Sequence, residues 1–217
     1  MTAVLVDPSL LTVYLYEDLK SFTDTTADMA PLLHLVLPHI SHFPNVSALK
    51  LDGCQAYERW DEGCTELLAS AFPALSHLTI LQLTFKSLPH LVDLVSSFPQ
   101  LTQLTADDLD ILEGKPRSSR ENQESYEGSK TPPPLLQSLQ FASGNYASGV
   151  GPFLSWLAAG PQALNTLYLE LDAEAGYVDA GVKLIEATGK NLIKLVLTHD
   201  DWQMCTFLAA SASHHIF

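Results

Sequence analysis

The chain has 217 residues, of which 47% are hydrophobic, and a formal net charge of −14 from 25 acidic and 11 basic residues. That length and apolar content suffice for the core of one domain, whereas the shortage of Lys and Arg argues against nucleic acids and anionic membrane surfaces as partners. The N-terminal residues lack the pattern of a signal peptide, no apolar run approaches the ~18 residues of a membrane span, and three cysteines make no disulfide framework. We therefore expect an intracellular protein of the cytoplasm or nucleus.

A short pattern recurs along the chain: an apolar residue, two variable residues, an apolar residue, one variable residue and an apolar residue. Its copies begin, in chain order, at Leu10, Val46, Leu78, Leu101, Leu136, Leu164 and Leu192. Alternate residues of a strand face the same side, so the closing apolar pair predicts a short strand with one buried face. In the last two copies, Leu167, Leu169, Leu195 and Leu197 should therefore be nearly fully buried. The last three copies begin 28 residues apart, within the span of about 20–29 residues that leucine-rich repeats have.

The segments between these strands carry apolar residues at spacings of three and four, which is typical of a helix with one buried face. Helices are expected along residues 29–43, along 60–72, from Ser87 with Pro89 in the first turn, after Gly151-Pro152, and along 177–185. Alternating strands and helices favour parallel strands. The sequence thus predicts an α/β leucine-rich-repeat solenoid, a curved parallel sheet of about seven short strands with helices on the convex side.

One segment interrupts the pattern. Residues 113–131 are polar and contain no aliphatic side chain, so burial cannot offset the entropy of ordering them. We predict a single leucine-rich-repeat domain over residues 1–217, with a disordered insertion at 113–131. Ser118 and Ser119 lie between Arg117 and Arg120, which leaves a phosphorylated, regulated segment as an alternative to a tolerated surface loop.

The sequence offers little that supports catalysis. The eight histidines lack the cysteine or acidic partners of a metal site, and neither a nucleophile elbow nor a glycine-rich phosphate loop occurs. Carboxylates that could act as acid and base gather after two strands, at Asp107, Asp108, Asp110, Asp200 and Asp201. With no nucleophile or base beside them, we expect no enzyme, no cofactor and no metal, and keep a hydrolase-like enzyme that uses these carboxylates as the alternative.

The remaining candidate site is the concave face of the predicted sheet, which faces away from the helices. Side chains between and after the paired apolar residues of each strand point to this face. Tyrosines among mixed polar side chains are typical of recognition surfaces. We expect a monomer that binds a protein partner, and the predicted partner-binding residues are Tyr14, Tyr16, Lys50, Asp52, Gln82, Asp107, Gln140, Tyr168 and Glu170.

The phrases FPNVSALKLDGC, AFPALSHLTILQLTF and SFPQLTQLTADDLDI resemble the ribonuclease-inhibitor-like leucine-rich regions of F-box proteins, especially the large fungal set. The resemblance runs from Leu10 to Asp201. Members of that family are substrate receptors of cullin–RING ubiquitin ligases, in which the F-box binds the ligase adaptor and the repeats hold the target. The resemblance therefore implies the substrate-recognition part of such a receptor. The F-box itself is not found in this chain, and a gene fragment without independent function is a further alternative.

Overall fold

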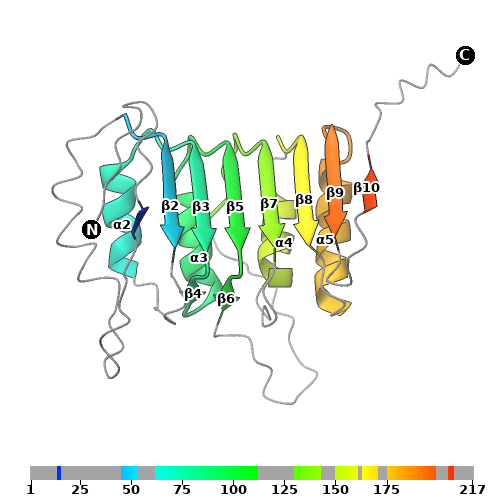
Figure 1. Ribbon diagram of the computed structural model, residues 1–217, viewed down its shortest axis with the longest axis horizontal. Coiled ribbons are helices and arrows are strands. Elements are labelled where there is room, and N and C mark those ends of the chain that lie inside the picture. The colour runs from blue at the N-terminus through cyan, green and yellow to red at the C-terminus, as the bar shows by residue number, and fades with distance from the viewer. Residues whose placement is uncertain are drawn as a thin grey trace, which may run out of the picture.

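The computed structural model describes residues 14–15, 45–52, 62–111, 130–142, 150–160, 163–170, 175–198 and 205–207 (Figure 1). These residues form an α/β structure around one main sheet, in which neighbouring strands follow the order β1-β2-β3-β5-β7-β8-β9-β10. The predicted α/β class with a parallel sheet is confirmed. The helix predicted along 29–43 lies outside the described residues, as do 113–129 of the predicted insertion.

The body of the sheet consists of six parallel strands of five residues each. They are β2 (Ala48–Asp52), β3 (His77–Leu81), β5 (Gln103–Asp107), β7 (Ser138–Ala142), β8 (Thr166–Glu170) and β9 (Lys194–Thr198). Shorter strands flank them: β1 (Tyr14–Leu15) pairs in parallel with β2, and β10 (Cys205–Phe207) pairs antiparallel with β9. All seven strands that the repeated pattern predicts are therefore present, and β10 is an addition that the pattern did not predict.

The helices lie together on one side of the sheet, behind the strands in the view of Figure 1. They are α2 (Glu62–Ala71), α3 (Leu88–Ser96), α4 (Val150–Ala159) and α5 (Ala175–Thr188). As predicted, Ser87 is the N-cap of α3 and Pro89 lies in its first turn. Gly151 and Pro152 lie inside the first turn of α4 and not before it; proline is tolerated there because the first N–H groups of a helix have no intrahelical partner.

Two rows of apolar side chains run across the sheet on the helix side. Strand pairing aligns Leu49, Leu78, Leu104, Leu139, Leu167 and Leu195 in one row, and Leu51, Ile80, Ala106, Phe141, Leu169 and Leu197 in the other. From β2 to β8 these side chains are almost completely buried. Burying each large one stabilises the fold by about 1.5–3 kcal/mol, so the two rows and the helices that cover them make the core.

The register predicted for the third strand is wrong. The sequence pattern was aligned on Leu78, Leu81 and Leu83, which would turn Leu81 and Leu83 toward the helices. In the structure Leu78 pairs with Leu49 and Ile80 with Leu51, so the pattern begins three residues earlier, at Leu75. Leu81 therefore lies on the opposite face of the sheet, and Leu83 is buried beyond the end of β3.

The turns before the strands explain this register. The N–H of Leu75 donates to the carbonyl of Phe72 at 3.1 Å, across a turn that contains Pro73. The same turn recurs one strand later, where the N–H of Leu101 donates to the carbonyl of Phe98 at 3.0 Å. Proline presets the backbone for the second position of such turns. The position of a Phe-Pro pair therefore predicts the start of the following strand more reliably than the leucines do. Around β3, leucines occur at more than one position that could begin the pattern.

A ladder of shared carbonyls joins each strand to the next. The N–H groups of Ser76 and His77 both donate to the carbonyl of Ser47 at 2.9 Å. The same pair of bonds recurs at four further positions, with distances between 2.7 and 3.0 Å, on the carbonyls of Ser76, Thr102, Gln137 and Asn165. Because every backbone group at the entry to a strand needs a partner, this ladder fixes where each strand begins relative to its neighbour.

A second, two-stranded sheet follows the main one and was not predicted. It pairs β4 (Thr84–Phe85) with β6 (Asp110–Ile111) in parallel. Each link from the main sheet passes through a residue with positive φ, Gln82 at 52° and Asp108 at 51°. Aspartate tolerates this left-handed conformation better than most residues. Leu83 and Leu109, which each follow one of these residues, are buried.

Lys130 and Thr131, the last two residues of the predicted insertion, lie within the described part of the chain. Lys130, within the predicted range, forms an ion pair with Asp93 of α3 at 2.7 Å. Its carbonyl accepts a hydrogen bond from the indole Nε1–H of Trp156 in α4 at 2.9 Å. Pro132 packs so closely on Gly160 that a Cβ there would lie 2.4 Å from the proline ring. These contacts order the chain from Lys130 onward, which composition alone does not reveal.

The expected burial of the last two closing pairs is half right. Leu167 and Leu169 are completely buried, whereas Leu195 and Leu197 are only partly buried. In the chain, β8, which carries Leu167 and Leu169, lies between α4 and α5, whereas no described helix follows β9 to cover the far side of Leu195 and Leu197 (Figure 1).

None of the described helices is both long and apolar enough to cross a membrane.

Replacing Leu169 by Ala should lower the free energy of unfolding by about 2–5 kcal/mol, because a completely buried leucine leaves a cavity when it is truncated. Leu135→Ala is the matched control, since Leu135 is 43% exposed, and it should cost no more than about 0.5 kcal/mol. Urea unfolding followed by circular dichroism measures both. A small loss for Leu169→Ala would contradict the register described above, because a slip of one residue turns this side chain outward.

Candidate interaction surface

The face of the sheet opposite the helices, here called the open face, carries three rows of side chains. The amino-end row lies where the strands begin and consists of Ala48, His77, Gln103, Ser138, Thr166 and Lys194. The middle row consists of Lys50, Thr79, Thr105, Gln140, Tyr168 and Val196. The carboxyl-end row, where the strands end, consists of Asp52, Leu81, Asp107, Ala142, Glu170 and Thr198.

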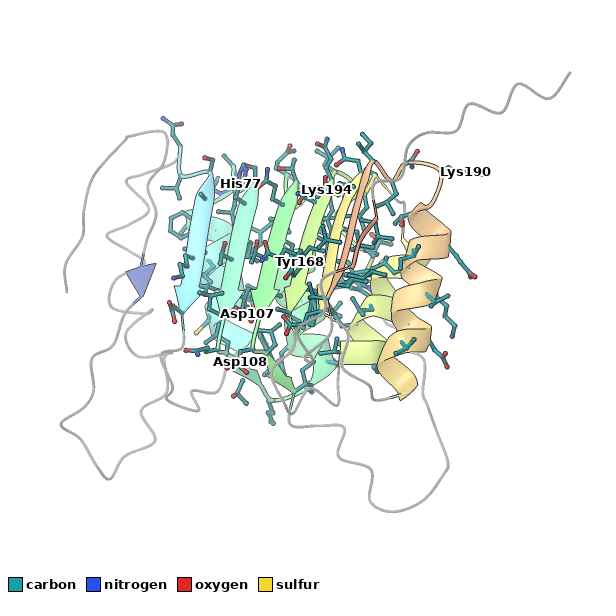
Figure 2. All side chains as sticks on the ribbon, turned by 45° about the vertical axis from the view of Figure 1, so that its right-hand side comes forward. His77, Asp107, Asp108, Tyr168, Lys190 and Lys194 are labelled. Atoms are coloured by element: carbon teal, nitrogen blue, oxygen red, sulfur yellow. The ribbon has the colours of Figure 1, made fainter. Side chains whose placement is uncertain are left out.

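These rows follow from the alternation of side chains along each strand. In β2, Leu49 and Leu51 enter the core, so Lys50 and Asp52 are turned to the open face. No described helix covers this face, and its side chains are mainly half-buried or exposed. Figure 2 shows the same arrangement, with Tyr168 in the middle of the sheet, His77 and Lys194 at the strand starts and Asp107 at a strand end.

The structure brings most of the predicted binding residues together. Lys50, Gln140 and Tyr168 lie in the middle row, and Asp52, Asp107 and Glu170 lie in the carboxyl-end row. The backbone of Tyr14 pairs with Lys50, which continues the middle row onto β1. Tyr16 lies outside the described residues.

The structure places Gln82 outside the strand to which the sequence pattern assigned it. It was expected between two inward leucines of the third strand, but it lies after β3 in the link to β4, with a φ of 52°. Its N–H donates to the carbonyl of Asp107 at 2.9 Å, so its backbone helps to join two strand ends. Thr79 occupies the place in the middle row that had been assigned to Gln82.

The amino-end row was missed altogether. Its members stand immediately before the first inward residue of each strand, so the same alternation that predicted the other two rows could have found them. His77 and Lys194 are the basic side chains of this row, which has no acidic member. The Nδ1 atom of His77 lies 2.8 Å from the hydroxyl oxygen of Ser76, which holds the ring at the entry to β3.

Charge is unevenly distributed over the open face. All the acidic residues of the three rows, Asp52, Asp107 and Glu170, lie in the carboxyl-end row. Asp52 forms an ion pair with Lys50 on the same strand at 2.9 Å. Asp107 is followed by a second carboxylate, Asp108, whose positive φ marks the link to β6. The face is thus acidic where the strands end and neutral to basic where they begin.

Burial raises the pKa of Asp107 above its usual value of 3.8, and the negative charge of Asp108 raises it further. A hydrogen bond from the backbone of Asp108 acts in the opposite direction and lowers the pKa of Asp107. The net effect is a raised pKa, so the folded chain favours the ionised form of Asp107 less than the unfolded chain does. The folded chain therefore bears a cost for holding a negative charge at this strand end.

The described residues offer little that catalysis would need. Within the described part of the chain, no three histidine, cysteine or acidic side chains converge as metal ligands would. The Ser87 hydroxyl oxygen lies 2.9 Å from Nδ1 of His90, but both side chains are buried where α3 begins, away from the open face. That contact joins the N-cap residue to the first turn of its own helix, and the Ser87 side chain makes no capping hydrogen bond to the helix backbone.

No protein-family model matches the chain, and the search of curated proteins found no match either.

The raised pKa of Asp107 predicts a pH dependence of stability. Above its usual pKa the unfolded chain loses this proton more readily than the folded chain, so stability falls as pH rises from that value through the raised one. Asp107→Asn removes the charge, and should raise the unfolding midpoint at pH 7 while making little difference near pH 3. Thermal unfolding at a series of pH values measures this, and an equal gain at both extremes would contradict it.

Proposed function

We propose that the chain is a leucine-rich-repeat protein, without enzymatic activity of its own, that binds a protein partner through the open face of its sheet. The observation that carries the proposal is the arrangement of the three rows: one strand after another presents side chains in register on a face that no described helix covers. Repeat proteins built of stacked strand–helix units use such extended faces for binding.

The spacing of the strands supports the leucine-rich-repeat assignment. With the third strand in its observed register, successive copies of the pattern begin 29 and 26 residues apart at Val46, Leu75 and Leu101. Both intervals fit the span of about 20–29 residues for such repeats. The copies that begin at Leu75 and Leu101 continue to buried Leu83 and Leu109, where the usual pattern has Asn or Cys.

The chemistry of the open face supports recognition of a protein. Tyr168 lies in the middle row beside Gln140, and charged side chains surround them at a distance of one or two strands. A tyrosine contributes a large contact area at a low cost in conformational entropy, and interfaces are enriched in it. In the receptor of a ubiquitin ligase, which the sequence resembles, this face would hold the protein that is to be modified.

Tyr168→Ala should weaken binding of the cellular partner by about 2 kcal/mol or more, roughly thirtyfold, because tyrosines at the centre of an interface commonly contribute that much. The tagged full chain is used to isolate partners from its native cell, and one purified partner is then titrated against the wild-type chain and the variant. Circular dichroism verifies that the variant folds.

The matched control for this experiment is Val182→Ala on α5, a side chain that is 45% exposed on the helix side of the molecule. Its affinity for the same partner should equal that of the wild-type chain. If Tyr168→Ala binds with unchanged affinity, or if Val182→Ala loses as much, the open face is not the binding surface.

The 217-residue chain by itself should not bind the ligase adaptor, because the family makes that contact through an F-box, and none is found in the sequence. A pull-down of the purified chain with the purified adaptor tests this. A direct, saturable complex would contradict the prediction and would mean that the repeats contact the adaptor themselves.

A further inference from the structure

The carboxyl-end row alternates between acidic and apolar or neutral side chains. Asp52 lies on β2, Asp107 on β5 and Glu170 on β8, while Leu81 on β3 and Ala142 on β7 separate them. One strand therefore lies between each acidic strand and the next. Since neighbouring strands are about 4.8 Å apart, carboxylates recur about every 9.6 Å across the sheet.

The interval of about 9.6 Å between carboxylates is close to the side-chain repeat of a polyproline II helix. A polyproline II helix rises about 3.1 Å per residue with three residues per turn, so every third side chain is on one side and recurs about every 9.3 Å. In an extended β-strand the side chains on one side recur about every 6.7 Å. In an α-helix the nearest equivalent spacing is seven residues, about 10.5 Å. Over the two intervals from Asp52 to Glu170, about 19.2 Å, six residues of polyproline II rise about 18.6 Å and fourteen residues of an α-helix about 21 Å. A β-strand places no side chain over the middle carboxylate, so the polyproline conformation fits the three positions best.

We propose that the carboxyl-end row binds an extended, proline-rich basic segment of a partner protein, which lies across the strands and places Lys or Arg at every third position over Asp52, Asp107 and Glu170. This inference rests on the proposed function, because it names the chemistry of the partner for the same open face. Lysine and arginine complement the charge of the row and that of the chain as a whole, whose formal net charge is −14.

A second feature of the face fits the same occupant. Tyr168 precedes Glu170 by two residues on β8, so both side chains lie on the open face, one row apart. Proline-rich segments bind to surfaces on which aromatic side chains meet the proline rings, and the preformed helix reduces the entropy lost on binding. A basic residue over Glu170 would place neighbouring prolines within reach of the Tyr168 ring.

The three carboxylates differ in their charged surroundings. Asp52 already has a cation, Lys50, at 2.9 Å, so it attracts a second cation less strongly than it would alone. Asp107 is followed directly by Asp108, so two carboxylates lie at this strand end and attract a cation more strongly than one carboxylate does. At the opposite end of the strands the ammonium group of Lys194 disfavours a cationic segment. The basic segment should therefore bind along the strand ends, with Asp107 as its main contact.

The test uses the full chain and two fluorescent nine-residue peptides of identical composition. One repeats Arg-Pro-Pro three times; the other has three contiguous arginines followed by six prolines. Fluorescence anisotropy should give the periodic peptide at least about fivefold tighter binding, since each correctly placed exposed ion pair contributes up to about that factor. Added salt should weaken both complexes.

Three variants sharpen the comparison. Asp107→Asn should weaken binding of the periodic peptide by about fivefold, and Lys50→Gln should strengthen it, because Asp52 is then released from its ion pair. Glu186→Gln is the matched control: it removes the same charge from an exposed position on α5 and should change the affinity by less than about twofold.

Equal affinity for the two peptides, or equal losses for Asp107→Asn and Glu186→Gln, would overturn the inference, since binding would then reflect net charge alone. Absence of binding by the periodic peptide would also overturn it. If the cellular partner is nevertheless lost with Tyr168→Ala, the open face remains the binding surface and only the nature of its occupant is wrong. If the partner is retained with Tyr168→Ala, the proposed function fails as well.

Discussion

The structure depends on the way in which one carbonyl at the entry to each strand accepts two N–H groups from the next strand. This contact recurs from Ser47 to Asn165, and it holds six strands in register although the helices between them differ in length. Register is decisive for such a sheet, because a slip of one residue exchanges the buried and open faces. The two apolar rows of the core and the three rows of the open face are thus consequences of the same backbone contact.

The sequence predicted a strand best where the apolar pattern could be aligned in only one way. At β7, β8 and β9 the pattern is isolated and its spacing regular, and the structure has the predicted strands at those places. Around β3, Ile80 and Leu81 both fit an inward position, and leucine content alone selected the wrong one. The turn between Phe72 and Leu75 resolves the ambiguity physically. Its equivalent between Phe98 and Leu101 was visible in the sequence, and counting from it would have placed Thr79 instead of Gln82 on the open face.

Other differences come from contacts between parts of the chain that no local pattern reports. Lys130 belongs to a polar stretch with the composition of a disordered loop, yet Asp93 and Trp156 hold it from two different helices. The partial burial of Leu195 reflects its position beside the last described helix and not its own sequence context. Most of the candidate site was nevertheless predictable, because a residue's place on the open face follows from strand alternation alone. The distances between charged side chains of the site depend on which strands are neighbours, and the sequence alone does not give that pairing.

Because the core and the open face are on opposite sides of the sheet, residues of the open face can be replaced without disturbing the core. Side chains of the open face point away from the packed leucines, so their charge can change without creating a cavity in the core. Asp107 illustrates the consequence: its own partial burial, and then the charge of its neighbour Asp108, raise its pKa, so its charge is less favourable in the folded chain than in the unfolded one. Asparagine at this position would avoid that cost. Groups kept at a cost to the fold are common at functional sites, and the position of Asp107 at the centre of the acidic row is the physical reason to look for the partner's cation there.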